Sequence, residues 1–249
     1  MSNDASTDPA PPIKAVVFDW GGTITPWNLV PRRLQWLAAG ALLDPSNSER
    51  AAEALAAAET EIWAIWAETS EVASILKVPG MAAERLGLPI SDELRDLVLV
   101  AHLETMAPNI HARPEARRAL AALKDRGLLV GVLTSSHWPR AWHERLFEED
   151  GLAGSLDVCI CGSDLKRAKP DPDSFLTVLR VLGVTPEESV FVADSPWDIS
   201  GAQSVGMRAI WLPNGLQEEE GTVAEAVVTD LTEVVDVIDR WLDPVPLSG

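Results

Sequence analysis

The chain has 249 residues, of which 47% are hydrophobic and 23% charged, so we expect a packed globular protein with one large domain or a core and a smaller partner. Its formal net charge of −18 repels phosphate backbones, which argues against nucleic-acid binding but leaves small phosphorylated substrates open. No run reaches the roughly 18 apolar residues that a membrane-spanning helix needs, so a membrane is not an expected partner either.

The N-terminal residues 1–12 (MSNDASTDPAPP) lack the basic segment and apolar centre of a secretory signal. We predict that they form a disordered tail and that the protein is cytoplasmic. Cys159 and Cys161 are separated by one residue of a predicted strand. We expect them to point to opposite faces, to be unable to bridge each other and to stay reduced.

The first predicted strand, residues 13–18, is a short apolar run that ends at Asp19 and a glycine turn. From about residue 31 to residue 106 the pattern is helical, and no convincing strand interrupts it. The expected helices cover residues 32–43, 48–70 and 91–106, with Ser48 and Ser91 as candidate N-caps. We interpret this block as a helical insertion of about 75 to 80 residues.

Strands and helices alternate in the rest of the chain. Helices are predicted over residues 114–127, 139–151, 171–183, 198–206 and 231–242, and strands over 128–134, 156–161, 189–194 and 207–212, with a short edge strand at 226–230. This alternation indicates a parallel sheet covered on both faces. The predicted fold is therefore α/β, with a Rossmann-like parallel-sheet core (13–28 and 108–249) and an inserted all-helical cap domain (29–107).

Polar side chains gather where the predicted strands end, which is where open α/β sheets bind ligands. They are Asp19 and Thr23, Thr134 with Ser135 and Ser136, Lys169, and Asp194 with Asp198. Clustered carboxylates repel one another unless a cation lies among them, and hard oxygen ligands suit magnesium. A lysine, a hydroxyl and N–H groups of the Gly21-Gly22 turn could then hold the oxygens of a phosphoryl group. Each residue alone has an ordinary explanation as a turn, helix-cap or surface residue, so the prediction depends on their common position.

Four segments resemble, in order, the four motifs of the haloacid dehalogenase-like hydrolase superfamily. They are FDWGGT at 18–23, VLTSS at 132–136, AKPDPDSF at 168–175 and VADSPWDISGAQSVGM at 192–207. The helical insertion between the first two resembles the cap of that superfamily's first subclass. The resemblance covers almost the whole chain from about Ile13.

The resemblance implies a magnesium-dependent hydrolase acting on a small phosphorylated metabolite. Asp19 would be the nucleophile and form a covalent aspartyl intermediate. Magnesium would be held by Asp19, the Gly21 carbonyl, Asp194 and Asp198. The expected substrate-binding residues are Gly22, Thr23, Thr134, Ser135 and Lys169, of which Thr134 and Lys169 are also expected to act in catalysis.

One position departs from the motif: Gly21 stands where family phosphatases carry a second aspartate. In those enzymes the aspartate protonates the leaving oxygen and later helps to activate water. General acid–base catalysis is typically worth about 10² to 10⁴ in rate. Metal binding and nucleophilic attack should therefore survive, while leaving-group protonation should be impaired.

Three explanations are open. The enzyme is a phosphatase whose substrate has a good leaving group, or whose acid comes from the cap or from His137. Alternatively, DWGGT resembles the DWAGT of phosphonoacetaldehyde hydrolases, which cleave a C–P bond through a Schiff base on a cap lysine; the only lysine in this predicted cap is Lys77, in a segment unlike theirs. Finally, the protein binds a ligand without turnover. A dehalogenase is a weaker interpretation, because those enzymes do not need the metal cluster and carry a tyrosine where Gly21 stands.

The chain has ten tryptophans and no tyrosine. Trp20, Trp27, Trp138 and Trp197 lie close in sequence to the catalytic positions or the cap hinge. They either seal the cap–core interface or line a site for an apolar or aromatic leaving group. Trp63 and Trp66 are expected to be packing residues of a cap helix.

Overall fold

The computed structural model describes residues 12–215 and 223–243, so the predicted tail lies outside the described residues apart from Pro12. Within these ranges, six parallel strands form one sheet in the order β3-β2-β1-β4-β5-β6. The strands are β1 (Ala15–Phe18), β2 (Leu129–Thr134), β3 (Val158–Cys161), β4 (Ser189–Ala193), β5 (Arg208–Trp211) and β6 (Ala226–Val227). The predicted α/β class and parallel sheet are confirmed, including the short edge strand.

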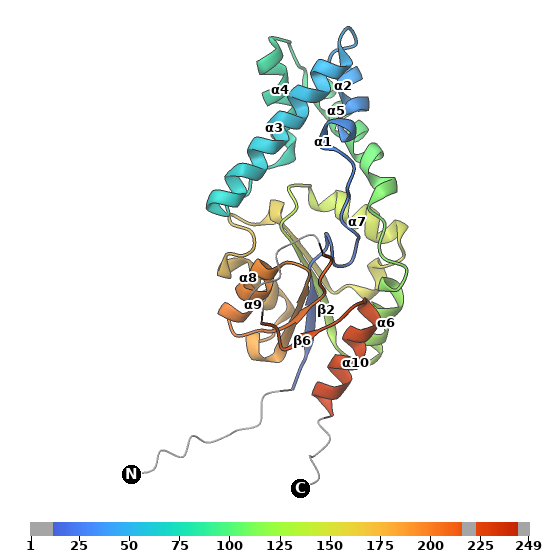
Figure 1. The fold of residues 1–249 in the computed structure, drawn as a ribbon, viewed down its shortest axis with the longest axis vertical. Helices are drawn as coiled ribbons and strands as arrows, with labels where there is room; N and C mark the ends of the chain where they lie inside the picture. The colour runs from blue at the N-terminus through green and yellow to red at the C-terminus, as the bar shows by residue number, and fades with distance from the viewer. Residues whose placement is uncertain (1–11, 216–222, 244–249) are drawn as a thin grey trace, which may run out of the picture.

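Helices cover both faces of the sheet, which explains why every residue of β1 is fully buried. Val16 and Phe18 belong to the hydrophobic cluster on one face, with residues of α6 (Ala116–Asp125), α7 (Arg140–Glu149) and α10 (Leu231–Leu242). Val17 belongs to the cluster on the other face, under α8 (Pro172–Leu182) and α9 (Pro196–Ser204). Figure 1 shows α6 and α10 on one side of the sheet and α8 and α9 on the other.

The segment between β1 and α6 contains five α-helices among the described residues. They are α1 (Arg32–Gln35), α2 (Leu37–Leu43), α3 (Ser48–Thr69), α4 (Val78–Leu86) and α5 (Asp92–Met106). They pack on one another at one end of the molecule, beyond the sheet (Figure 1). Single 3₁₀ turns occur at Ile75–Lys77, Ala107–Asn109, Ala153–Ser155, Gly162–Asp164 and Pro186–Glu188. In the described part of the chain, no helix has the length and apolar character to cross a membrane.

Three local predictions in this helical segment need correction. The helix predicted over residues 32–43 is interrupted at Trp36, which lies between α1 and α2. Helix α4 was not predicted, because Pro79 and Gly80 are helix-breaking signals. Pro79 lies in the first turn, where its missing N–H does no harm, and the helix buries Val78 and Ala82. The cap of α3 is Asn47 rather than Ser48, since the Asn47 side chain accepts a hydrogen bond from the Arg50 N–H. The expected cap at Ser91 is confirmed by its bond from the Leu94 N–H.

The two cysteines were assigned to opposite faces of their strand, and this was wrong. Residues i and i+2 of a strand share a face. Cys159 and Cys161 both belong to the cluster that contains Val16, and their Sγ atoms lie 3.5 Å apart. Both are buried free thiols.

Candidate active site

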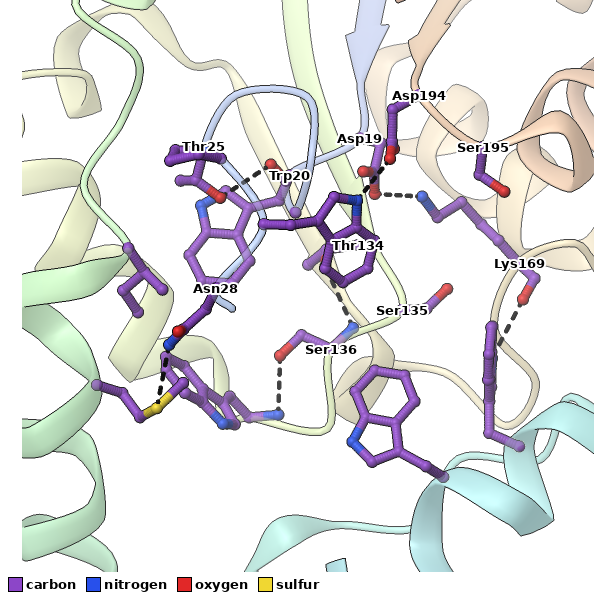
Figure 2. Close-up of a pocket in the computed structure, with 18 of the residues that line it drawn as sticks. Asp19, Trp20, Thr25, Asn28, Thr134, Ser135, Ser136, Lys169, Asp194 and Ser195 are labelled. Carbon is purple, nitrogen blue, oxygen red and sulfur yellow. Dashed lines mark hydrogen bonds and ion pairs between the residues drawn. The ribbon is translucent and has the colours of Figure 1, made fainter. Parts of the chain in front are cut away.

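The carboxyl ends of β1, β2 and β4 lie next to one another in the sheet and bring the predicted catalytic side chains into one cavity of about 370 Å³. Asp19 follows β1, Thr134 ends β2, and Asp194 follows β4. Lys169, from the loop before α8, and Asp198, from the first turn of α9, complete the group. Figure 2 shows Asp19, Asp194 and Lys169 side by side.

Lys169 is the buried cation of this group. Its side chain is almost fully buried, and its Nζ lies 2.5 Å from Asp19 Oδ1 and 2.6 Å from Asp198 Oδ2. Burial opposes the charged form, but the carboxylates of Asp19 and Asp198 outweigh it and raise the pKa of Lys169 above its usual value. Lys169 is therefore a fixed ammonium that orients the Asp19 carboxylate.

Asp194 is held from several directions. Its Oδ2 accepts hydrogen bonds from the Trp27 indole at 2.7 Å and the Asn214 amide at 2.5 Å, and its Oδ1 accepts one from the Thr23 hydroxyl at 3.3 Å. Burial and then the negative charge of Asp19 raise the pKa of Asp194 to about 7, and the Trp27 hydrogen bond opposes this rise. Two neighbouring carboxylates therefore repel each other in this cavity.

A divalent cation would relieve that repulsion. No three His, Cys, Asp or Glu side chains in residues 12–215 and 223–243 are grouped so that they could hold a metal ion by themselves. Magnesium, however, is commonly bound through one or two carboxylates and completed by waters and substrate oxygens. Asp19, Asp194 and the Gly21 carbonyl fit such a set. Asp198 has a different partner, because Lys169 binds its carboxylate.

Two of the expected substrate-binding residues, Gly22 and Thr23 in the loop after β1, lie outside the cavity lining. The Gly22 N–H donates to the Thr25 carbonyl at 2.8 Å, and the Thr23 hydroxyl donates to the Asp194 carboxylate. Neither residue lines the cavity, whereas Gly21 does. Gly22 has a φ of +90°, and a Cβ there would lie 2.4 Å from Asp194 Oδ2, so this position requires glycine.

Hydroxyl groups after β2 border the cavity, as predicted. Thr134 is buried, and its Oγ1 accepts a hydrogen bond from the Ser136 N–H at 3.2 Å. Ser135 Oγ is buried and has no hydrogen-bond partner within the part of the chain that the structure describes. A buried hydroxyl on a cavity wall without a partner fits a site that receives polar oxygens from a ligand.

The helical segment supplies residues that the sequence did not identify as part of the site. Arg32 and Gln35 of α1, Glu59 of α3, and His102 and Met106 of α5 line the cavity. Trp63 and Trp66 were expected to be packing residues, but they also line it. Their spacing on α3 could not indicate which neighbour that helix faces. The Trp66 indole donates to the Lys169 carbonyl at 3.2 Å, which joins α3 to the loop that carries the lysine.

Two other residues considered from the sequence lie away from the cavity. Lys77 is exposed and is not among the lining residues. His137 is buried against the Trp63 ring, with ring centroids 4.1 Å apart, and it does not line the cavity either. Burial, and then the charge of Arg32, lower the pKa of His137 to about 4, so it is neutral near pH 7 and a poor candidate for the missing acid.

Comparison with known proteins agrees with these motifs. The model of a family of hydrolases, described as haloacid dehalogenase-like hydrolase, matches residues 13–206. A phosphoserine phosphatase of Thermus thermophilus is 37% identical over 123 residues, and the match spans 49% of this chain and 49% of that protein. A phosphoglycolate phosphatase of Rhodospirillum rubrum is 30% identical over 214 residues, which are 83% of this chain and 82% of that one.

Solved structures with the same fold include both phosphatases and dehalogenases. A phosphatase from Thermococcus onnurineus is 25% identical, with a TM-score of 0.63, and the match covers 91% of this chain and 98% of that one. A 2-haloacid dehalogenase from Pseudomonas syringae is 28% identical, with a TM-score of 0.67, and the match covers 92% of this chain and 99% of that one.

Proposed function

The chain belongs to the haloacid dehalogenase-like hydrolases, and on that premise we propose that it is a magnesium-dependent phosphatase for a small phosphorylated metabolite. The observation that carries the proposal is the grouping of Asp19, Asp194 and Lys169 in one cavity, with the Lys169 ammonium 2.5 Å from Asp19. The phosphatases among its relatives give the reaction class. The cytoplasmic location stays a prediction.

The positions of these side chains support the following mechanism. Lys169 binds Oδ1 of Asp19, which leaves Oδ2 as the atom to attack phosphorus. The new O–P bond forms as the bond to the leaving oxygen breaks, and the leaving group departs with that electron pair. Water then hydrolyses the aspartyl phosphate and regenerates the Asp19 carboxylate. In this mechanism Thr134, Ser135 and Lys169, which line the cavity, bind the phosphoryl oxygens.

Magnesium, when bound by Asp19, Asp194 and the Gly21 carbonyl, would supply positive charge to the phosphoryl group. The chain's own contribution is to keep those ligands in place. Trp27, Asn214 and Thr23 hold Asp194, and Asp198 holds Lys169. This division of roles makes Asp198 a positioning residue for the lysine.

The alternatives from the sequence are less well supported. C–P cleavage of the phosphonoacetaldehyde type needs a reactive lysine in the helical segment, and Lys77 is exposed outside the cavity. A ligand-binding role without turnover gives no reason for a buried Asp19–Lys169–Asp198 arrangement, because burying charges is costly.

Cleavage of a carbon–halogen bond is the second candidate. The 28% identity to a 2-haloacid dehalogenase over nearly the whole chain favours it, and so does a nucleophilic aspartate paired with a lysine. The carboxylate of Asp194 beside Asp19, and the Ser135 hydroxyl that has no partner among the described residues, favour a metal and a phosphoryl group instead.

The test is release of inorganic phosphate from a panel of aryl, sugar and alkyl phosphates, with magnesium and with a chelator, and release of chloride from 2-chloropropionate. We expect phosphate release that needs magnesium and is abolished in Asp19→Asn. The matched control is Asp236→Asn, since Asp236 is exposed on α10. Chloride release without phosphate release would replace the proposal with the dehalogenase.

A further inference from the structure

Tryptophan is the commonest residue in the wall of the active-site cavity. Six of the ten tryptophans line it, from the loops after β1 and β2 and from helices α3 and α9. They are Trp20, Trp27, Trp63, Trp66, Trp138 and Trp197. Figure 2 shows the Trp20 ring together with Ser135, Ser136 and the catalytic group around the same space. Rings from both the core and the helical segment therefore surround whatever is attached to the phosphoryl group.

Three of these indoles donate their N–H to another group of the protein. The N–H of Trp27 donates to Asp194 at 2.7 Å, that of Trp66 to the Lys169 carbonyl at 3.2 Å, and that of Trp63 to Glu59 at 3.4 Å. A tryptophan whose N–H is already bonded has only ring carbon to offer a ligand. These three rings therefore suit an apolar or aromatic group better than a sugar.

Arg32 and Glu59, the charged residues of the helical segment that line the cavity, bind each other and neighbouring side chains. Arg32 Nε lies 3.4 Å from Glu59 Oε2, and its Nη1 donates to the Thr60 hydroxyl at 2.9 Å. Glu59 is buried and also accepts a hydrogen bond from the Trp36 indole at 2.7 Å. The two charges offset each other at that end of the cavity.

An independent observation concerns Gly21, which stands where family phosphatases carry an aspartate. Gly21 lines the cavity, and a Cβ there would have no other atom within 4 Å, so the space for an acidic side chain is open. The pKa of a phenol is about 10, against about 16 for water. A phenolate therefore departs without a proton donor far more readily than an alkoxide does.

Both observations indicate the same class of substrate. We propose that the natural substrate is a phosphate monoester of a phenol-like aromatic alcohol, whose ring lies among the tryptophans and whose oxygen leaves without help from an acid. This inference rests on the proposed phosphatase function and deepens it. Asp19 forms the O–P bond, the P–O(aryl) bond breaks, and its electron pair leaves on the phenolate, which is protonated by solvent. Water then cleaves the aspartyl phosphate, so the products are the phenol and phosphate.

The test compares kcat/KM for phenyl phosphate, a hexose phosphate and an alkyl phosphate, with magnesium, in wild type, Gly21→Asp and Gly21→Asn. We expect wild type to favour phenyl phosphate by about a hundredfold or more, which is the lower range of what a general acid contributes. Gly21→Asp should gain activity on the alkyl phosphate. Gly21→Asn has nearly the same shape but no acid, and it should show no such gain.

The aromatic wall is tested with Trp63→Leu. We expect KM for phenyl phosphate to rise about threefold to tenfold, as the loss of a ring contact predicts. Trp241→Leu is the control, because Trp241 lies on α10 outside the cavity, and it should leave KM unchanged.

The comparison of the three phosphate esters with the wild-type enzyme tests the substrate class even if a variant fails to fold. A hexose or alkyl phosphate cleaved as fast as phenyl phosphate would overturn this inference and leave the phosphatase proposal intact. Release of phosphate from no ester would overturn the proposed function and this inference together.

Discussion

Lys169 connects two carboxylates that would otherwise be buried without a counter-ion. Asp19 and Asp198 are both buried, and each lies within hydrogen-bonding distance of its ammonium. The proposed mechanism therefore gives the lysine a structural as well as a catalytic role, and the two roles can be separated by experiment.

Replacing Lys169 by methionine keeps the length of the side chain and removes its charge. We expect kcat to fall at least a hundredfold, because the Asp19 carboxylate and the phosphoryl oxygens lose their cation. The free energy of unfolding should fall by about 3–5 kcal/mol, since two buried carboxylates lose their partner. Phosphate-release kinetics and urea unfolding measure the two effects. Lys77→Met is the control, and a matching loss of activity there would contradict the assignment.

The grouping of the candidate catalytic residues could be predicted because the carboxyl ends of parallel strands meet at one edge of a sheet. Asp19, Thr134 and Asp194 each follow or end a recognisable strand. The other half of the cavity could not be predicted. Whether Arg32 or Trp63 reaches the site depends on how the helical segment folds over the core, and helical periodicity does not contain that information.

At the scale of elements, the long periodic segments were predicted well and the short irregular ones were not. Strands β1–β5 and the helices that cover them follow clear apolar patterns. Helix α4 was missed because its stability comes from burying Val78 and Ala82 against its neighbours, which overrides its unfavourable proline and glycine. The hydrogen bond of the Gly22 amide to Thr25 could not be predicted, because it depends on the detailed path of the loop.

Gly40 and Gly80 give a matched test of helix packing in the helical segment. A Cβ at Gly40 of α2 would lie 2.6 Å from the Ser48 carbonyl and 2.7 Å from the Ala52 nitrogen, so α3 would have to move. We expect Gly40→Ala to destabilise the protein by about 1–3 kcal/mol. A Cβ at Gly80 of α4 meets no atom within 4 Å, and Gly80→Ala should stabilise by about 0.5–1 kcal/mol. Thermal unfolding measures both, and equal effects would contradict the packing described here.

At the scale of the whole molecule, the helical segment and one face of the sheet share one continuous hydrophobic cluster. Histidines are buried among its aromatic residues. The His102 ring stacks on Trp36 with centroids 3.8 Å apart, and the His143 ring lies 4.5 Å from that of Trp20. Burial lowers the pKa of His102 to about 4 and that of His143 to about 3, so both are neutral in the folded protein near pH 7.

These depressed pKa values predict a loss of stability in acid. The pKa of a histidine in the unfolded chain is about 6.5. Below that pH the unfolded chain binds protons, whereas the buried imidazoles stay neutral, so the free energy of unfolding falls as the pH drops toward their folded pKa values. His143→Leu removes one such group. We compare the unfolding free energy of the variant with that of the wild type at each pH. The variant should be about 2 kcal/mol more stable, relative to the wild type, at pH 5 than at pH 7. A difference that does not change with pH would contradict the buried neutral imidazole.

The proposed mechanism requires that Asp19 becomes covalently phosphorylated during turnover. It is tested most directly by mixing the enzyme with phenyl phosphate and magnesium, quenching in acid within the first turnovers, and locating any added phosphoryl group by peptide mass spectrometry. We predict one phosphoryl group on Asp19 in the wild type and none in Asp19→Asn. Phosphate release with an unmodified Asp19 at every quench time, or with the group on another residue, would contradict the account.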